Sequence, residues 1–277
     1  MKLENRKALV TGAAKGIGYS TASRLLRDGA VVTLWDVDEE GLDAAKAELS
    51  NSIPGSAGRI FTAVCDVSDQ GAVQARAEQA EEDMGGVDIL INNAGFMAPG
   101  FFLEQPLDSW KKTVDINLTS ILFTSHAFLP GMYRRGFGHV VNISSAAGLV
   151  GVPGLSAYCA SKWGVFGLTE SLRHESRIRS GGKVKFSSVH PMFLRTGMFE
   201  GASLKGLGSI IFPRVANHDV IAKAIVEGAL KRGRRVVKRP RSLRLVLLLR
   251  GLLPDAIFNG MSRIMNVHTS MNRYKGA

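Results

Sequence analysis

The stretch "TGAAKGIG", residues 11–18, decides the fold, because it directly follows the first apolar run of the chain and precedes a helical pattern. Its glycines let the backbone turn tightly and approach a pyrophosphate, whose negative charge is favoured at the N-terminus of the following helix. A glycine-rich turn alone is a weak signal, but one placed between a strand and a helix is typical of dinucleotide binding. The residues of this turn that we expect to contact a dinucleotide are Gly12, Lys15, Gly16, Ile17 and Gly18.

Apolar runs alternate with helical patterns along the rest of the chain, which predicts a parallel sheet with helices on both faces. The predicted strands are residues 8–11, 31–36, 60–66, 87–92, 139–144, 184–190 and 235–238. The predicted helices are residues 17–28, 39–49, 69–84, 107–129, 157–180 and 219–231. Pro130 and Gly131 are expected to end the fourth helix. The fold class is therefore α/β, a single doubly wound Rossmann-type domain with a seven-stranded parallel sheet over residues 1–238, followed by a C-terminal extension.

The composition is that of an ordinary soluble globular protein, with 277 residues, 45% of them apolar and 21% charged. Cys65 and Cys159 match neither a disulfide framework nor a metal-ligand spacing, which favours a reducing intracellular compartment. His126, His174 and His190 have no paired spacing with other ligands, so we expect no metal site. The first residues enter an apolar strand at once and leave no room for a secretion signal. We therefore expect a cytoplasmic protein.

Asp36 ends the second predicted strand, eighteen residues after Gly18. A carboxylate at this position can accept hydrogen bonds from an adenosine ribose, and it repels a 2′-phosphate. Lys15 favours NADP, because an ammonium group beside the turn can pair with the 2′-phosphate of that cofactor. We weigh the carboxylate more heavily and predict NAD as the cofactor, with NADP as the alternative.

Further motifs follow in order along the chain: "CDV" at 65–67, "NNAG" at 92–95, Asn117, "VNISS" at 141–145 and "YCASK" at 158–162. Together with the glycine-rich turn they resemble the short-chain dehydrogenase/reductase family over about residues 3–238. The resemblance implies an oxidoreductase that uses a nicotinamide dinucleotide. The additional cofactor-binding residues that it implies are Asp66, Val67, Asn93, Ala94, Gly95, Tyr158, Lys162, Pro191, Leu194 and Thr196.

Four residues carry the predicted chemistry. Tyr158 and Lys162 are four positions apart, so they share a helix face, and an ammonium near a phenol lowers the pKa of the phenol. Ser145 precedes the tyrosine by thirteen residues, and its hydroxyl can hydrogen-bond the substrate oxygen during hydride transfer. Ser144 would point to the other side if the strand persists. In the family, the asparagine that Asn117 matches holds a water for proton relay.

The segment after the sixth strand departs from the family pattern. Met192 stands where the family has a glycine, a change that bears on the local turn. Pro191, Leu194 and Thr196 still match the segment that closes over the nicotinamide. Residues 194–217 are expected to form a mobile lid over the substrate, because their glycine content suits such a segment.

Residues 239–277 extend beyond the usual end of the fold. Residues 243–253 form an apolar helix too short to span a bilayer, and the extension resembles those of members that act on lipids, retinoids or sterols. Nine of the twenty residues 231–250 are Lys or Arg, within a net charge of +11. This run is either a solvated edge or a peripheral contact for a membrane surface. It lacks the aromatic residues and motifs of nucleic-acid binding. The extension is expected to border the substrate pocket or a neighbouring subunit, since the family commonly forms homodimers or homotetramers.

The sequence thus predicts an NAD-dependent enzyme that interconverts an alcohol and its ketone or aldehyde by hydride transfer, on an apolar substrate. Two alternatives stay open at this point. One is a 3-oxoacyl-thioester reductase that uses NADPH, and the other is a non-catalytic nicotinamide-binding sensor or scaffold. The pairing of Ser145 with Tyr158 argues against the sensor, which needs neither hydroxyl.

Overall fold

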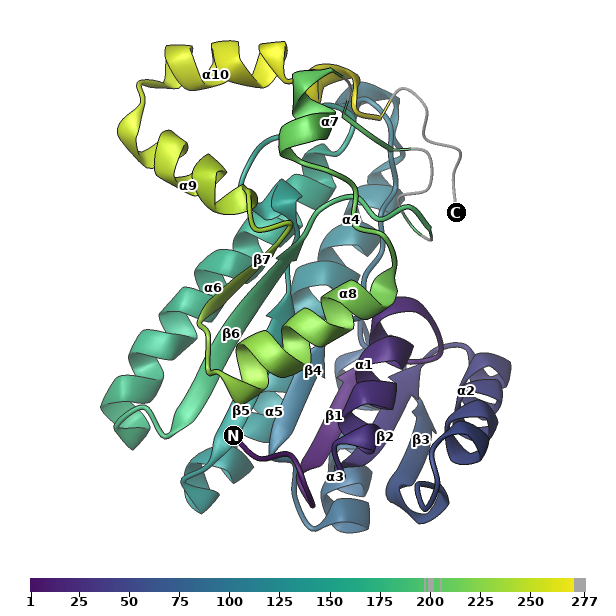
Figure 1. The fold of residues 1–277 in the computed structure, drawn as a ribbon. Helices are drawn as coiled ribbons and strands as arrows, with labels where there is room; N and C mark the ends of the chain where they lie inside the picture. The colour runs from purple at the N-terminus through teal and green to yellow at the C-terminus, as the bar shows by residue number, and fades with distance from the viewer. Residues whose placement is uncertain (197, 199–201, 205, 272–277) are drawn as a thin grey trace.

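The computed structural model describes residues 1–196, 198, 202–204 and 206–271. In this part of the chain seven parallel strands form one sheet in the order β3-β2-β1-β4-β5-β6-β7, which confirms the predicted doubly wound α/β fold (Figure 1). The strands are β1 (Lys7–Thr11), β2 (Val31–Asp36), β3 (Ile60–Val64), β4 (Ile89–Asn92), β5 (Gly138–Ile143), β6 (Val184–Pro191) and β7 (Val236–Arg239). The strand order reverses between β1 and β4, so a crevice is expected at their carboxyl ends.

Helices cover both faces of the sheet (Figure 1). The main helices are α1 (Gly16–Arg27), α2 (Glu39–Ser52), α3 (Gln70–Met84), α4 (Leu107–Val114), α5 (Ser120–Arg135), α6 (Ser156–Ser180) and α8 (His218–Lys223). Short 3-10 turns are η1 (Ala57–Arg59), η2 (Phe102–Glu104) and η4 (Ala146–Gly148), and π-helical segments are η3 (Asp115–Thr119) and η6 (Ala224–Lys231). Successive side chains of β1 point to opposite faces of the sheet and so belong to two different parts of the core. Ala8 and Val10 pack with α1, α2 and η6, whereas Leu9 packs with α3 and α5.

The helix predicted for residues 107–129 is longer than expected and changes pitch. α4 passes through η3 into α5, and α5 continues beyond Pro130 to Arg135. The prediction that Pro130 ends the helix is wrong, because contacts made after it outweigh the backbone hydrogen bond that proline removes. Met132 is fully buried in the core, and Gly136, with a φ of 61°, caps the end of the helix.

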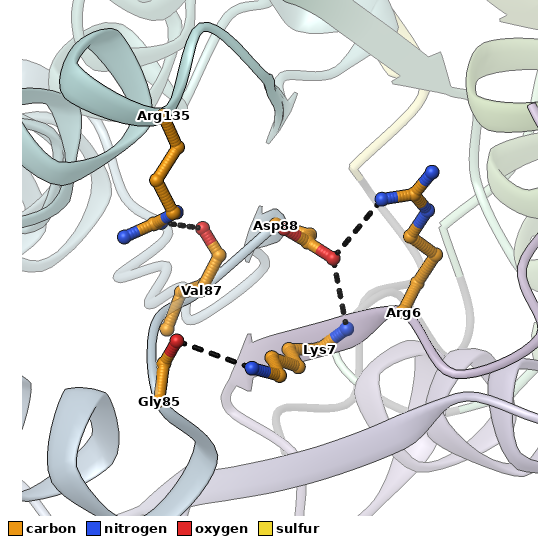
Figure 2. A network of polar contacts seen from close by, with 6 residues as sticks. All are labelled: Arg6, Lys7, Gly85, Val87, Asp88 and Arg135. Carbon is orange, nitrogen blue, oxygen red and sulfur yellow. Dashed lines mark hydrogen bonds and ion pairs between the residues drawn. The ribbon is translucent and has the colours of Figure 1, made fainter.

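Figure 2 shows how the end of α5 is fastened to the amino-terminal edge of the sheet. Arg135 donates a 2.7 Å hydrogen bond to the carbonyl of Val87, just before β4. Beside it, the Asp88 carboxylate accepts hydrogen bonds from the Arg6 guanidinium at 3.5 Å and from the Lys7 backbone N–H at 3.4 Å. These contacts tie the ends of β1, β4 and α5 together at the edge opposite to the crevice.

Other predicted elements differ from the structure mainly at their ends. The helix predicted for residues 219–231 is α8 followed by the π-helical η6. β3 ends at Val64 rather than at residue 66, because the Asp66 carboxylate accepts a 2.9 Å hydrogen bond from the Ser68 N–H and forms a turn there.

The C-terminal extension crosses the carboxyl end of the sheet as two helices, α9 (Leu243–Leu252) and α10 (Asp255–Ile264), followed by η7 (Val267–Thr269) (Figure 1). Leu243 is buried with Phe193 and Phe212 of the preceding segment. The Arg250 guanidinium lies 4.7 Å from the centre of the Trp163 ring on α6. Among the described residues, no helix combines the length and the apolar character that crossing a bilayer requires.

The predicted lid, residues 194–217, contains α7 (Leu207–Ile211) and an isolated parallel bridge between Leu194 and Val215. Positions 197, 199–201 and 205 of this lid lie outside the described residues, as do positions 272–277 of the extension.

Candidate active site

The glycine-rich turn has a shape that only glycine permits at three positions. Gly12 and Gly16 have φ angles of 64° and 65°, in the left-handed region. A Cβ on Gly18 would collide with the carbonyl oxygen of Gly12. Asn93 of the "NNAG" motif donates a 2.9 Å hydrogen bond to that same carbonyl. Two motifs that lie eighty residues apart therefore fix the turn together.

A cleft of about 560 Å³ opens at the carboxyl ends of the strands, beside this turn. Every predicted cofactor-binding residue lines it except Gly18, which lies beneath the turn. Those that line it are Gly12, Lys15, Gly16, Ile17, Asp36, Asp66, Val67, Asn93, Ala94, Gly95, Tyr158, Lys162, Pro191, Leu194 and Thr196. A cleft of several hundred Å³ lies in the usual range for a cofactor site.

Asp36 lies in this cleft at the end of β2, where its carboxylate shapes the adjoining loops. One oxygen accepts a 3.0 Å hydrogen bond from the Ala14 N–H, and the other accepts a 2.9 Å hydrogen bond from the Val37 N–H. The carboxylate oxygens have further lone pairs for the hydroxyls of a ribose. Lys15 lines the same cleft, so both predicted determinants of cofactor choice are present in it.

Ser145 and Tyr158 meet at the mouth of the cleft. Ser145 follows β5 and adopts an extended conformation with φ −163° and ψ 166°, and its side chain hydrogen-bonds the phenol of Tyr158. The neighbouring Ser144 turns the other way and donates a 2.8 Å hydrogen bond to the carbonyl of Lys162. The two hydroxyls thus have different partners, the backbone of α6 for Ser144 and the phenol of Tyr158 for Ser145.

Lys162 and Tyr158 share one face of α6, as their spacing predicts. The Lys162 Nζ lies 5.7 Å from the centre of the Tyr158 ring and donates a 2.9 Å hydrogen bond to the carbonyl of Ile143. Burial lowers the pKa of Lys162 to about 8. Burial also raises the pKa of Tyr158 above its usual value, while the Ser145 hydrogen bond opposes this rise. The prediction of a net lowering by Lys162 is therefore wrong for this structure, because desolvation of the phenol dominates.

Asn117 lies behind the cleft, fully buried in the π-helical segment η3. Its Oδ1 accepts a 2.8 Å hydrogen bond from the Phe96 N–H, and its Nδ2 donates to the Phe96 carbonyl at 2.8 Å and to Ser161 Oγ at 3.1 Å. The side chain therefore joins the loop after β4 to α6, the helix that carries Tyr158.

A second, apolar pocket of about 90 Å³ adjoins the cleft and shares Ser145 and Met192 with it. The C-terminal extension supplies much of its wall. The lining residues from α9 and α10 are Leu243, Leu245, Val246, Leu249, Phe258, Met261 and Ser262. The extension thus closes an apolar space next to the two hydroxyls.

Met192 is compatible with the local turn. Its φ is not positive, so a glycine is not needed at this position, and its N–H donates a 2.8 Å hydrogen bond to the carbonyl of Arg239 at the end of β7. The side chain is buried and lines both the cleft and the apolar pocket.

Several lining residues carry no signal in the sequence. Phe96, Lys112, Ile116 and His218 all line the cleft. The His218 ring lies 3.7 Å from where a Cβ on Gly16 would be, although the two residues are about two hundred positions apart. Only the packing of α8 against α1 brings them together, so no local pattern predicts the contact.

The chain is similar to known proteins over most of its length. A family model described as short chain dehydrogenase matches residues 6–205. Epidermal retinol dehydrogenase 2 of Mus musculus is 38% identical over 248 residues, which cover 89% of this chain and 77% of that protein. Estradiol 17-beta-dehydrogenase 11 of Macaca fascicularis is 29% identical over 259 residues, which cover 94% of this chain and 83% of that protein.

The fold is similar to the crystal structure of a short-chain dehydrogenase/reductase from Burkholderia phymatum in complex with NAD. The TM-score is 0.79 at 27% identity, and the match covers 91% of this chain and 94% of that one. The family model, the sequence relatives and the solved structure agree with the motifs that meet in the cleft. The chain therefore belongs to the short-chain dehydrogenase/reductase family and is an oxidoreductase that uses a nicotinamide dinucleotide.

Proposed function

We propose that the chain interconverts an apolar alcohol and its ketone or aldehyde with NAD(H). One observation carries the proposal: Ser145 lines both the cofactor cleft and the apolar pocket, so its hydroxyl lies where the two meet. A substrate in the apolar pocket would bring its oxygen to Ser145 and Tyr158. The names of the relatives, a retinol dehydrogenase and an estradiol dehydrogenase, support a retinoid-like or sterol-like substrate.

The two hydroxyls would handle the substrate oxygen. The nicotinamide, when bound, donates or accepts the hydride. Tyr158 gives its phenolic proton to the substrate oxygen during reduction and takes a proton back during oxidation. The Ser145 hydroxyl, which hydrogen-bonds Tyr158, donates to the same oxygen as negative charge develops on it.

Lys162 would support the charge of the phenolate. With a pKa of about 8 it is mostly protonated at pH 7. An ammonium near the ring favours the phenolate over the phenol and so opposes the effect of burial. Its hydrogen bond to the Ile143 carbonyl holds the side chain in place. Asn117 would keep the loop after β4 in register with α6 through its bonds to Phe96 and Ser161.

A spectrophotometric screen tests the proposal. NAD and NADP are each combined with primary and secondary alcohols of increasing apolar area, with retinol and a sterol, and with 3-oxoacyl thioesters. We expect NAD-linked oxidation that grows more efficient with the apolar area of the alcohol. Turnover confined to thioesters with NADPH would replace the proposal by a thioester reductase. Binding of NADH without turnover of any substrate would identify a sensor.

We also propose that the C-terminal segment, residues 231–277, attaches the protein to an anionic membrane surface on the cytoplasmic side. The segment holds 12 of the 35 Lys and Arg residues and one of the 24 Asp and Glu residues. The other 230 residues therefore carry 23 of each, so the whole net charge of +11 belongs to this segment. Each basic residue near an anionic lipid surface contributes about 1 kcal/mol of attraction.

Aliphatic side chains project from the same segment. Leu245, Leu248 and Leu252 on α9 are 42%, 57% and 70% exposed, and their spacing of three and four places puts them on one face. Ile257 and Ile264 on α10 are 53% and 67% exposed. Apolar residues flanked by arginines are typical of helices that lie in a membrane interface. Both helices line the apolar pocket, so membrane contact would place that pocket beside dissolved apolar alcohols.

Co-sedimentation with vesicles tests the membrane contact. We expect the protein to pellet with vesicles of phosphatidylcholine and phosphatidylserine, but weakly with phosphatidylcholine alone. A chain truncated after Lys238, or the double variant Leu248→Ser with Leu252→Ser, should stay in the supernatant. Ile178→Ser is the matched control, because Ile178 is 87% exposed on α6, outside the segment. Equal pelleting of all four proteins would contradict the proposal.

We propose that the protein is a homodimer or a homotetramer that pairs through its two long helical stretches, α4 to α5 and α6, as is common in the family. Leu107 of α4 and Leu122 of α5 are 72% and 46% exposed, which supports an apolar contact on this side. Sedimentation velocity would show the assembly, and Leu122→Arg should shift it to the monomer. A monomer at all concentrations would exclude the proposal.

A further inference from the structure

His190 is a buried histidine at the end of β6, directly beside Ser145. Its Nδ1 lies 3.1 Å from the carbonyl oxygen of Ser145, and its Nε2 lies 3.0 Å from Ser188 Oγ. The ring meets Phe166 edge to face, with the ring centres 5.0 Å apart. The side chain is fully buried, so these contacts define its orientation.

The chemistry of these partners assigns the tautomer. A carbonyl oxygen can only accept a hydrogen bond, so Nδ1 must carry the hydrogen. Nε2 of the neutral ring then has only a lone pair, and the Ser188 hydroxyl donates to it. Burial, with smaller effects of Lys238 and Lys162, lowers the pKa of His190 to about 4, while the Ser145 carbonyl opposes this lowering. The ring is therefore neutral at physiological pH and donates toward Ser145.

The position of this donor matters because the β5–β6 ladder ends here. The Ser144 N–H still donates a 2.8 Å hydrogen bond to the Val189 carbonyl. Pro191 follows on β6 and has no backbone N–H to offer β5. The ring of His190 instead donates to the carbonyl of the following residue, Ser145, which also accepts a 3.0 Å hydrogen bond from the Gly148 N–H.

We propose that His190 is a positioning residue that fixes the backbone of Ser145, so that the serine hydroxyl stays against Tyr158 and the substrate oxygen. This inference rests on the proposed function of Ser145. The ring lines neither the cleft nor the apolar pocket, and among Ser145, Ser188 and Phe166, which it contacts, Ser145 is the residue that lines both.

Two variants separate the two hydrogen bonds of the ring. In His190→Asn the side-chain amide nitrogen can replace Nδ1 and keep a donor for the Ser145 carbonyl. In His190→Gln the amide reaches the position of Nε2 and loses that donor. Both variants remove the ring and its contact with Phe166, so a purely structural role would affect them alike.

We expect His190→Gln to lower kcat about tenfold to a hundredfold, the size of effect that a small misplacement of a catalytic group produces. KM and the dissociation constant of NADH, measured by fluorescence, should change less than threefold. His190→Asn should recover most of kcat. In the Ser145→Ala background, His190→Gln should cause no further loss of the residual turnover. The proposal would be overturned if His190→Gln and His190→Asn lowered kcat equally. It would also be overturned if His190→Gln lowered turnover as much in the Ser145→Ala background as in the unaltered protein.

The tautomer of His190 can be measured by NMR on the unaltered protein. This test needs neither a folded variant nor a known substrate. A long-range ¹H–¹⁵N spectrum, assigned by comparison with His190→Asn, should show His190 as the neutral tautomer with hydrogen on Nδ1 from pH 6 to pH 8. A hydrogen on Nε2 would overturn the inference even if the enzyme turns over alcohols. The expected tautomer in a protein without turnover would contradict the proposed function and leave the geometry of His190 intact.

Discussion

The body of the protein, residues 1–230, and its C-terminal segment, residues 231–277, differ in how they use charge and apolar surface. The body is balanced, with 23 basic and 23 acidic residues, and its apolar side chains form two clusters on either side of the sheet. The segment carries the entire net charge and leaves leucines and isoleucines exposed on α9 and α10. The comparison agrees with the proposed division of work: the body contains the cleft and the hydroxyls of Ser145 and Tyr158, while the segment lines much of the apolar pocket.

The largest expected effect lies in the body. Tyr158→Phe removes the proton that the substrate oxygen needs, so turnover should fall by about 10²–10⁴-fold, the usual contribution of a general acid or base. The dissociation constant of NADH and the binding to anionic vesicles should stay nearly unchanged. Tyr133→Phe, on α5 and away from the cleft, is the control and should keep full activity. Retained turnover in Tyr158→Phe would refute the mechanism.

A second change tests the segment. Arg241→Gln together with Arg244→Gln should weaken binding to phosphatidylserine vesicles by about thirtyfold, because two basic residues near the surface contribute about 2 kcal/mol. Turnover of a short water-soluble alcohol should not change. The pair Arg177→Gln with Arg179→Gln, exposed on α6, is the matched control. If the control weakens binding equally, net charge rather than the segment governs the contact.

A third test uses pH and concerns two buried histidines of the body. Burial lowers the pKa of His139 to about 3 and of His190 to about 4, against about 6.5 in the unfolded chain. The unfolded state therefore binds more protons below pH 6.5. The free energy of unfolding should fall by about 2 kcal/mol per histidine as the pH falls from 6.5 to 5.

Urea unfolding at pH 7 and pH 5 measures this loss. His139→Gln should lose about 2 kcal/mol less between the two pH values than the unaltered protein does. His174→Gln, which changes an exposed histidine, should behave like the unaltered protein. An identical pH dependence in all three proteins would show that the His139 ring is not kept neutral by the fold.

The smallest expected effect concerns cofactor choice. Asp36→Ser removes the carboxylate that repels a 2′-phosphate, and Lys15 remains in the same cleft to pair with that phosphate. The ratio of kcat/KM for NADP to that for NAD should rise about tenfold, which corresponds to about 1.4 kcal/mol. The further change Lys15→Gln should reverse part of this gain. An unchanged ratio would show that Asp36 acts only through its bonds to the Ala14 and Val37 N–H groups.

The sequence by itself determined the fold class, the glycine-rich turn and the grouping of the candidate site. These follow from local rules, such as the strand period of two, the helix spacing between Tyr158 and Lys162, and the need for glycine at Gly12. The order of alternating strands and helices then requires the motif-bearing loops to meet at the carboxyl edge of one sheet. This is why residues as distant as Gly12 and Thr196 could be assigned to one cleft.

Only the tertiary structure decided the features that depend on residues far apart in the chain. α5 continues past Pro130 because Arg135 reaches Val87 and Met132 is buried, and neither contact shows in the local pattern. The pKa of Tyr158 rises because the packed chain excludes water from the phenol, a property of the assembled site rather than of its spacing from Lys162. The same holds for the apolar pocket under α9 and α10. Burial and long-range contacts come from packing, so local periodicity cannot encode them.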